Sequence, residues 1–178
     1  MPFGGTNDKR IGKNSVILNK TTADGKAAAR ITSWIAQNDI NDPKPLSLDV
    51  LKLETFDDCV NVLATSNAMR IKRERRGDEL RDAVYAYIKQ GPLSFDEFAM
   101  VFDYLSYDYG LVKTAMHAVM FAKSKGSARV PPEMDRIEAF CKKHGVWGEM
   151  LEIERMIVKG MVEKDAADKE AELSLIHI

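Results

Sequence analysis

The sequence has few cysteines, few prolines and no long apolar run. Its 178 residues include two cysteines and six prolines. Cys59 and Cys141 are too few for a disulfide framework or a four-thiolate zinc site, so we expect them to lie in helix cores in a reducing compartment. No run reaches the roughly 18 apolar residues of a membrane helix, which argues against direct membrane insertion.

Targeting signals are also absent from the start of the sequence. Residues 1–20 contain neither the apolar core of a secretory signal nor the Arg- and Ser-rich character of a transit peptide. A presequence removed earlier or an incomplete start would give the same picture. The start therefore predicts no compartment.

The chain has no excess charge of either sign. It carries 26 basic and 27 acidic residues, for a formal net charge of −1. This balance excludes nucleic-acid binding through overall charge and leaves only a local basic patch.

Strand patterns are missing, and helical ones take their place. We find no alternation of apolar and polar residues with a period of two, whereas Met, Ala, Leu, Lys and Glu are abundant. Apolar residues recur at helical spacing from residue 55 onward. The predicted fold class is therefore all-α.

Composition shifts divide the chain into four parts. Residues 1–22 are expected to form an extended arm, and residues 23–54 a capping helix and a loop. Residues 55–162 are expected to hold the regular helices, and residues 163–178 a charged tail. The last six residues, 173–178, look like translated sequencing adaptor; the alternative is a native apolar hook that docks onto a partner.

Helix starts and ends are marked by recognisable signals. Asp24 and Thr55 are predicted N-caps, and Ser94 with Glu97 forms a predicted capping box. Further helices are expected to open at Gly77-Asp78 and at Pro131-Pro132. The predicted helix breakers are Gly91, Gly110, Gly126 and Gly145.

These breakers recur at a nearly constant interval. Gly91 to Gly126 and Gly110 to Gly145 both span 35 residues, and Gly126 to Gly160 spans 34. One helical hairpin cannot bury its apolar face alone, so a period of this length predicts about three stacked helix-turn-helix units. The alternative is an irregular helical bundle with accidental glycine spacing.

The order of small residues resembles that of the pentatricopeptide repeat (PPR) family. Residues 115–126 (AMHAVMFAKSKG) are similar to the end of a PPR motif, and residues 83–91 and 151–160 are weaker copies. The resemblance covers about 105 residues and implies a short solenoid of PPR-like repeats. It also implies a possible role in binding single-stranded organellar RNA.

The family's base-reading positions are poorly matched. In that family, a small polar residue near position five of the first helix acts with an Asp or Asn at the repeat end. The second and third units have Val101 and Arg136 at position five, and the first offers Ser66 with Asp96 in an uncertain register. We therefore expect RNA to be the less favoured partner.

Several exposed-type residues remain as candidate contacts for protein or RNA. Residues 70–76, here called the basic segment, are able to contact phosphates, cap a helix end or dock an acidic partner. Aromatic side chains near the helix turns are able to stack on bases, although packing is the commoner role. The candidate residues are Arg70, Lys72, Arg73, Arg75, Arg76, Tyr107, Tyr109 and Trp147.

No catalytic, metal or cofactor site is predicted. His117, His144 and His177 have no partners at metal-ligand spacing, and no phosphate-binding loop or local nucleophile pair is present. The chain is therefore expected to be non-catalytic and to need no cofactor.

Size and repeat type together indicate a class of partner. A chain of 20.0 kDa with this repeat type is similar to the small PPR-like subunits on the F1 head of mitochondrial ATP synthase in some protists, which lie outside the α subunits. This resemblance implies a protein-binding subunit in the mitochondrial matrix. A subunit of a mitochondrial ribosome or of another respiratory complex would give a similar sequence.

Overall fold

The computed structural model describes residues 23–37, 51–126 and 133–176, without the side chains of 169–176. All regular structure in these ranges is helical, which confirms the predicted all-α class. The expected arm, the loop after the first helix and Pro131-Pro132 lie outside the described residues. The helices are α1 (Gly25–Gln37), α3 (Phe56–Ala68), α4 (Arg73–Arg76), α5 (Glu79–Gln90), α6 (Phe95–Tyr104), α7 (Tyr109–Ser124), α8 (Met134–Lys143) and α9 (Trp147–Ile176).

The predicted helix caps are confirmed at three starts. Oδ1 of Asp24 accepts a hydrogen bond from the Ala27 amide at 2.8 Å. Thr55 caps α3 in the same way, and Ser94 with Glu97 forms the complete capping box of α6. These side chains satisfy amides that have no partner within the helix, so the sequence fixes where each helix begins.

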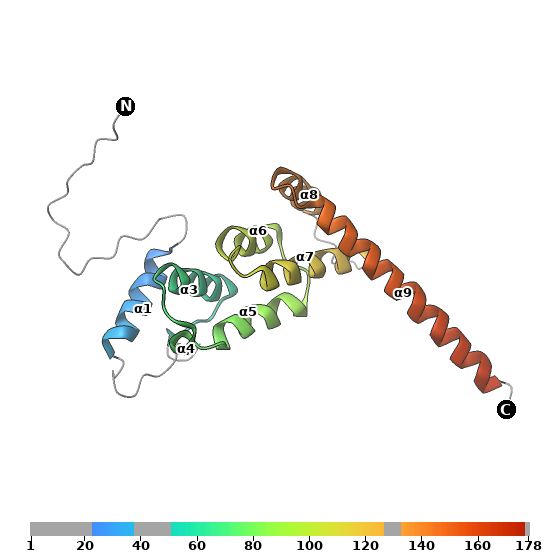
Figure 1. Ribbon diagram of the computed structural model, residues 1–178, viewed down its shortest axis with the longest axis horizontal. Coiled ribbons are helices and arrows are strands. Elements are labelled where there is room, and N and C mark those ends of the chain that lie inside the picture. Colours follow the sequence, from blue (N-terminus) through green and yellow to red (C-terminus); the bar gives the residue numbers. More distant parts are fainter. Residues whose placement is uncertain (1–22, 38–50, 127–132, 177–178) are drawn as a thin grey trace.

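The helices are arranged as three consecutive hairpins: α3 with α5, α6 with α7, and α8 with α9. The first helices form one row, in which α3 contacts α6 and α6 contacts α8. The second helices form another row, in which α5 contacts α7 and α7 contacts α9. Figure 1 shows this progression, with α1 packed on α3 at one end and α9 at the other.

Polar links tie successive hairpins together at equivalent ends of their helices. The Phe95 amide, at the start of α6, donates to the Glu133 carboxylate beside the start of α8 at 2.8 Å. Tyr109, the first residue of α7, donates its hydroxyl to Glu149 in the first turn of α9. Neighbouring helices within each of these rows therefore run parallel.

The core is a continuous apolar cluster that includes residues of every helix except the four-residue α4. Cys141 is buried as expected, and burial raises the pKa of its thiol to about 11. Cys59 is only half-buried. Ile35 of α1 and Tyr87 of α5 are exposed, because the buried stripe of each helix is narrower than its full set of apolar residues.

The predicted helix break at Gly110 is wrong, whereas Gly91, Gly126 and Gly145 lie at helix ends as predicted. Gly110 is the second residue of α7 and Gly160 lies inside α9, so neither breaks a helix. Gly91 has an extended backbone, whereas Gly126 and Gly145 have φ values of +57° and +73°. Glycines at one interval thus have three different conformations.

The first helices of the three hairpins recur at a longer interval than the glycines, whereas the second helices, which begin at residues 79, 109 and 147, have no constant interval. The first helices α3, α6 and α8 begin at residues 56, 95 and 134, which are 39 residues apart in both steps. Each of these helices has an aspartate at its second position: Asp57, Asp96 and Asp135.

The last helix continues far beyond the packed hairpins. α9 is 30 residues long, and Figure 1 shows its C-terminal half projecting away from the other helices. Its buried positions are Met150, Ile153 and Ile157, and Met161 packs against the core with partial exposure. The expected charged tail therefore begins inside α9 as a solvated helix.

Candidate functional site

The basic segment forms the connection between α3 and α5. After the C-cap Met69, Arg70 has a φ of +56°. Its amide donates to the Asn67 carbonyl, and the Ile71 amide donates to the Ser66 carbonyl. These two bonds define a Schellman ending, whose left-handed position usually holds glycine. The chain thus places an arginine where glycine is the unstrained residue.

The cations of the basic segment are mostly exposed. Arg73 forms two 3.0 Å hydrogen bonds with Asp78, and this pairing lowers the pKa of the Asp78 carboxyl. Among the described residues, no carboxylate lies within ion-pair distance of the other four cations, which are Arg70, Lys72, Arg75 and Arg76. The segment therefore presents a positive surface to solvent.

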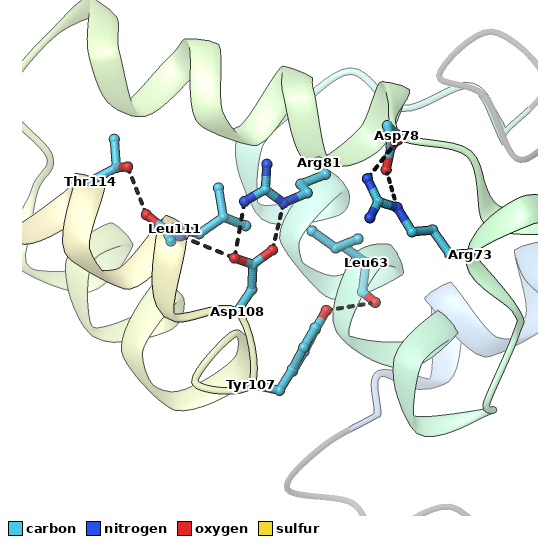
Figure 2. A network of polar contacts seen from close by, with 9 residues as sticks. Leu63, Arg73, Asp78, Arg81, Tyr107, Asp108, Leu111 and Thr114 are labelled. Carbon is cyan, nitrogen blue, oxygen red and sulfur yellow. Dashed lines mark hydrogen bonds and ion pairs between the residues drawn. The ribbon is translucent and has the colours of Figure 1, made fainter.

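Tyr107 lies next to this segment, in the turn between α6 and α7. Its hydroxyl donates to the Leu63 carbonyl of α3 at 3.2 Å (Figure 2). Burial of the hydroxyl raises the pKa of Tyr107 to about 12, against the opposing effect of the nearby Arg76. The ring remains 43% exposed. The structure thus brings Tyr107 and Arg76 together, but the tyrosine hydroxyl already links two hairpins.

A second link between the same hairpins was missed in the sequence. Arg81 of α5 binds both carboxylate oxygens of Asp108, at 2.6 and 3.1 Å (Figure 2). Asp108 also caps α7 by accepting from the Leu111 amide. The Arg81 guanidinium holds the pKa of Asp108 below its ordinary value. Aspartate is a common N-cap residue, so Asp108 was a usable signal for the start of α7. The predicted helix start was instead placed after Gly110.

Tyr109 and Trp147 belong to a different part of the molecule. Tyr109 is bonded to Glu149, and the half-buried Trp147 ring has the ammonium groups of Lys123 and Lys142 within 5.8 and 6.0 Å of its centre. Tyr109 thus links α7 to α9, and Trp147 links α9 to both α7 and α8. The candidate residues therefore separate into two groups. Tyr109 and Trp147 form the second group, which stabilises the interface between the second and third hairpins.

Three of the four positions compared with base-reading residues are not free to read bases; the exception is Asp96, whose side chain is 83% exposed and lies 3.7 Å from the Arg136 guanidinium. Val101 and Ser66 are fully buried, and the Ser66 hydroxyl donates to the Leu63 carbonyl. Arg136 pairs with Glu133 at 2.6 Å and lies over the Phe95 ring at 4.1 Å. None of these three side chains offers a free polar edge to a nucleotide.

The described ranges contain neither a metal-binding cluster nor a membrane-spanning helix. No group of three or more His, Cys, Asp or Glu side chains there could hold a metal ion. Helices long and apolar enough to cross a membrane are likewise absent from this part of the chain. His117 is exposed on α7, where its ring stacks on Phe121, and His177 lies outside the described residues.

A groove between α5 and α7 was not anticipated from the sequence. Its larger hollow, of about 480 Å³, lies between Tyr85 and Lys89 of α5 and the outward face of α7. An adjoining hollow of about 210 Å³ shares Lys89 and Phe121 with it. The available signal was a second helical stripe on α7, in which Lys113, His117 and Phe121 are each four residues apart.

Comparison with known proteins gives no further assignment. The chain matches no family model, no curated protein and no solved structure.

Proposed function

We propose that this chain is a non-catalytic, protein-binding subunit of a mitochondrial multiprotein complex, attached in the matrix to the F1 head of ATP synthase through an α subunit. The stacked hairpins would act as a short PPR-like solenoid, a rigid scaffold whose outer faces contact other subunits. The choice of ATP synthase as the complex and of the mitochondrial matrix as the compartment is based on the sequence resemblance.

One observation carries the preference for protein over RNA. Val101 and Ser66, at positions compared with the base readers, are fully buried. Sequence-specific RNA recognition requires exposed hydrogen-bonding groups at such positions. A stack that has packed these positions into its core retains the scaffold of the family without its readout.

A second candidate, an organellar single-stranded RNA-binding factor, is favoured by one feature. The basic segment carries four cations with no carboxylate partner among the described residues. Such a surface is able to neutralise phosphates, with an affinity that falls steeply as salt rises.

Native affinity purification from mitochondria separates the two. The tagged chain is purified from halves of one lysate, with and without nuclease, and co-purifying proteins are quantified by mass spectrometry. We expect subunits of the ATP synthase head in both halves at constant stoichiometry. Partners lost after nuclease treatment, or enriched RNA, would overturn the proposal; ribosomal or other respiratory subunits would move it to another complex.

A further inference from the structure

We infer that the groove between α5 and α7 is the docking site for an acidic amphipathic helix of a partner protein. This inference rests on the proposed protein-binding function and names the surface and the chemistry of the partner. None of the residues predicted from sequence as contacts lies in this groove.

The groove has the elongated shape expected of a site that binds one helix. Along α7 and its C-cap, lining residues recur every three or four positions and so share one face: Gly110, Thr114, Ala118, Phe121 and Lys125. The α5 residues Tyr85 and Lys89 form the opposite wall. Two adjoining hollows along parallel walls fit an elongated ligand better than a compact one.

Apolar anchors line its walls and floor. Tyr85 and Phe121 are 38% and 40% exposed, and they face the hollow from different helices. Ala118 also lines the hollow, and its small side chain leaves room for an incoming one. Aromatic side chains around a small-residue floor are typical of the central, strongly contributing part of protein interfaces.

The charge of the groove selects an acidic occupant. The residues lining the two hollows include three lysines, Lys89, Lys113 and Lys125, and no aspartate or glutamate. No ion pair joins these lysines to any described carboxylate; the Lys89 ammonium lies 5.1 Å from the Tyr85 ring centre and that of Lys125 lies 4.7 Å from the Phe121 ring centre. Carboxylates flanking an apolar helix face would pair with these ammonium groups.

RNA is the other source of negative charge, and the lining disfavours it. The rings of Tyr85, His117 and Phe121 line the larger hollow and would allow base stacking there. The adjoining hollow has only one aromatic ring, that of Phe121, and is otherwise lined by the aliphatic side chains of Ile88, Pro92, Ala118 and Ala122 and by polar residues. Single-stranded nucleic acid sites instead combine a positive groove with a run of stacking platforms. We therefore assign the groove to a protein helix and make RNA binding an outcome of the test.

The direct test uses the full-length chain and three labelled probes. One is a synthetic helix of about 18 residues with a Leu/Phe face flanked by glutamates. The second has the same apolar face flanked by lysines, and the third is a single-stranded RNA. Fluorescence anisotropy is measured at about 150 mM salt, where exposed long-range charge effects are screened.

We expect saturable binding of the acidic helix only. Lys89→Glu combined with Lys113→Glu should weaken the affinity for the acidic helix by about tenfold or more, because two attractive contacts become repulsive. Phe121→Ala should weaken it by about tenfold through loss of an anchor. Lys143→Glu, at an exposed lysine of α8 outside the groove, is the matched control and should stay within about twofold. Far-ultraviolet circular dichroism verifies that each variant folds.

Three results would overturn the inference: no saturation with the acidic helix, equal binding of the lysine-flanked helix, or RNA binding that the groove substitutions abolish. Purification of the double lysine variant from mitochondria separates this inference from the proposed function. If this variant retains its native partners at full stoichiometry, the groove is not the docking site, and the proposed function is unaffected. If the wild-type chain purifies without partners, the proposed function is contradicted. The probe-binding measurements alone then test whether the groove binds an acidic helix.

Discussion

Individual side chains connect one hairpin to the next mainly near the ends of helices. Tyr107 bonds the Leu63 carbonyl, Arg81 binds Asp108, and the Phe95 amide donates to Glu133. The Arg81 and Phe95 contacts satisfy a charged group and a backbone amide that one hairpin alone would leave to water, whereas the Leu63 carbonyl also accepts from the Ser66 hydroxyl. Contacts of this kind fix how hairpins are set against each other, while apolar burial supplies most of the stabilisation.

The dual role of Asp108 predicts two separable losses. Asp108→Asn removes the charge but leaves an oxygen able to cap α7, and it should lower the free energy of unfolding by about 1 kcal/mol, a modest value because Arg81 is partly exposed. Asp108→Ala should cost about 1 kcal/mol more through loss of the cap. Urea denaturation measures both. Equal losses for the two variants would contradict the separate roles.

The pH dependence of this pair has a defined sign. Because Arg81 lowers the pKa of Asp108 from its ordinary value of 3.8, the pair contributes stability fully above that value. The contribution is lost as the pH falls through the lower, folded-state pKa. The difference between wild type and Asp108→Asn should therefore be constant near neutral pH and shrink in acid below about pH 4. A difference that grew in acid would contradict the assignment.

Arg70 predicts a stabilising substitution. Glycine adopts a φ of +56° without the steric cost that arginine has there. Arg70→Gly should raise the free energy of unfolding by up to about 1 kcal/mol, measured by urea denaturation. Arg75→Gly, inside the short α4, is the control and should be neutral or destabilising. Loss of stability in Arg70→Gly would show that its side chain is needed for packing.

At the scale of elements, local signals predicted most helix starts and helix ends and failed at Gly110. Capping by Asp24, Thr55 and Ser94 depends on a few neighbouring residues, so the sequence is sufficient to place it. A glycine is permissive, and its conformation depends on the packing around it. For that reason Gly126 ends a helix in the structure while Gly160 does not.

The long helix α9 predicts a clear boundary for truncation. Among its described side chains, the last apolar one that contacts the core is Met161, so deletion of residues 165–178 should change the melting temperature by no more than about 2 °C. Deletion from residue 153 onward also removes Ile153 and Ile157, each contributing about 1.5–3 kcal/mol of burial, and should unfold the third hairpin. Thermal unfolding followed by circular dichroism compares the two. Strong destabilisation by the shorter deletion would show that the projecting segment packs within the chain.

At the scale of the whole molecule, stacked hairpins follow from the sequence but the groove does not. The periodic apolar stripes predict neighbours that bury each other, and the contacts of α5 with α7 and of α7 with α9 are consistent with this. The groove needs Tyr85 and Phe121 opposite each other. That juxtaposition depends on the register between two helices, which no local pattern specifies.

The central claim is that this stack engages protein, with the α5–α7 groove as its contact surface. Its most direct test is cross-linking mass spectrometry of the native mitochondrial assembly, using an amine-reactive reagent in one portion and ultraviolet light in another. The account predicts inter-protein cross-links from Lys89, Lys113 or Lys125 to residues beside an acidic helix of one partner, and no nucleotide adducts. Nucleotide adducts on Tyr107 or the basic segment, without protein cross-links from the groove, would contradict it.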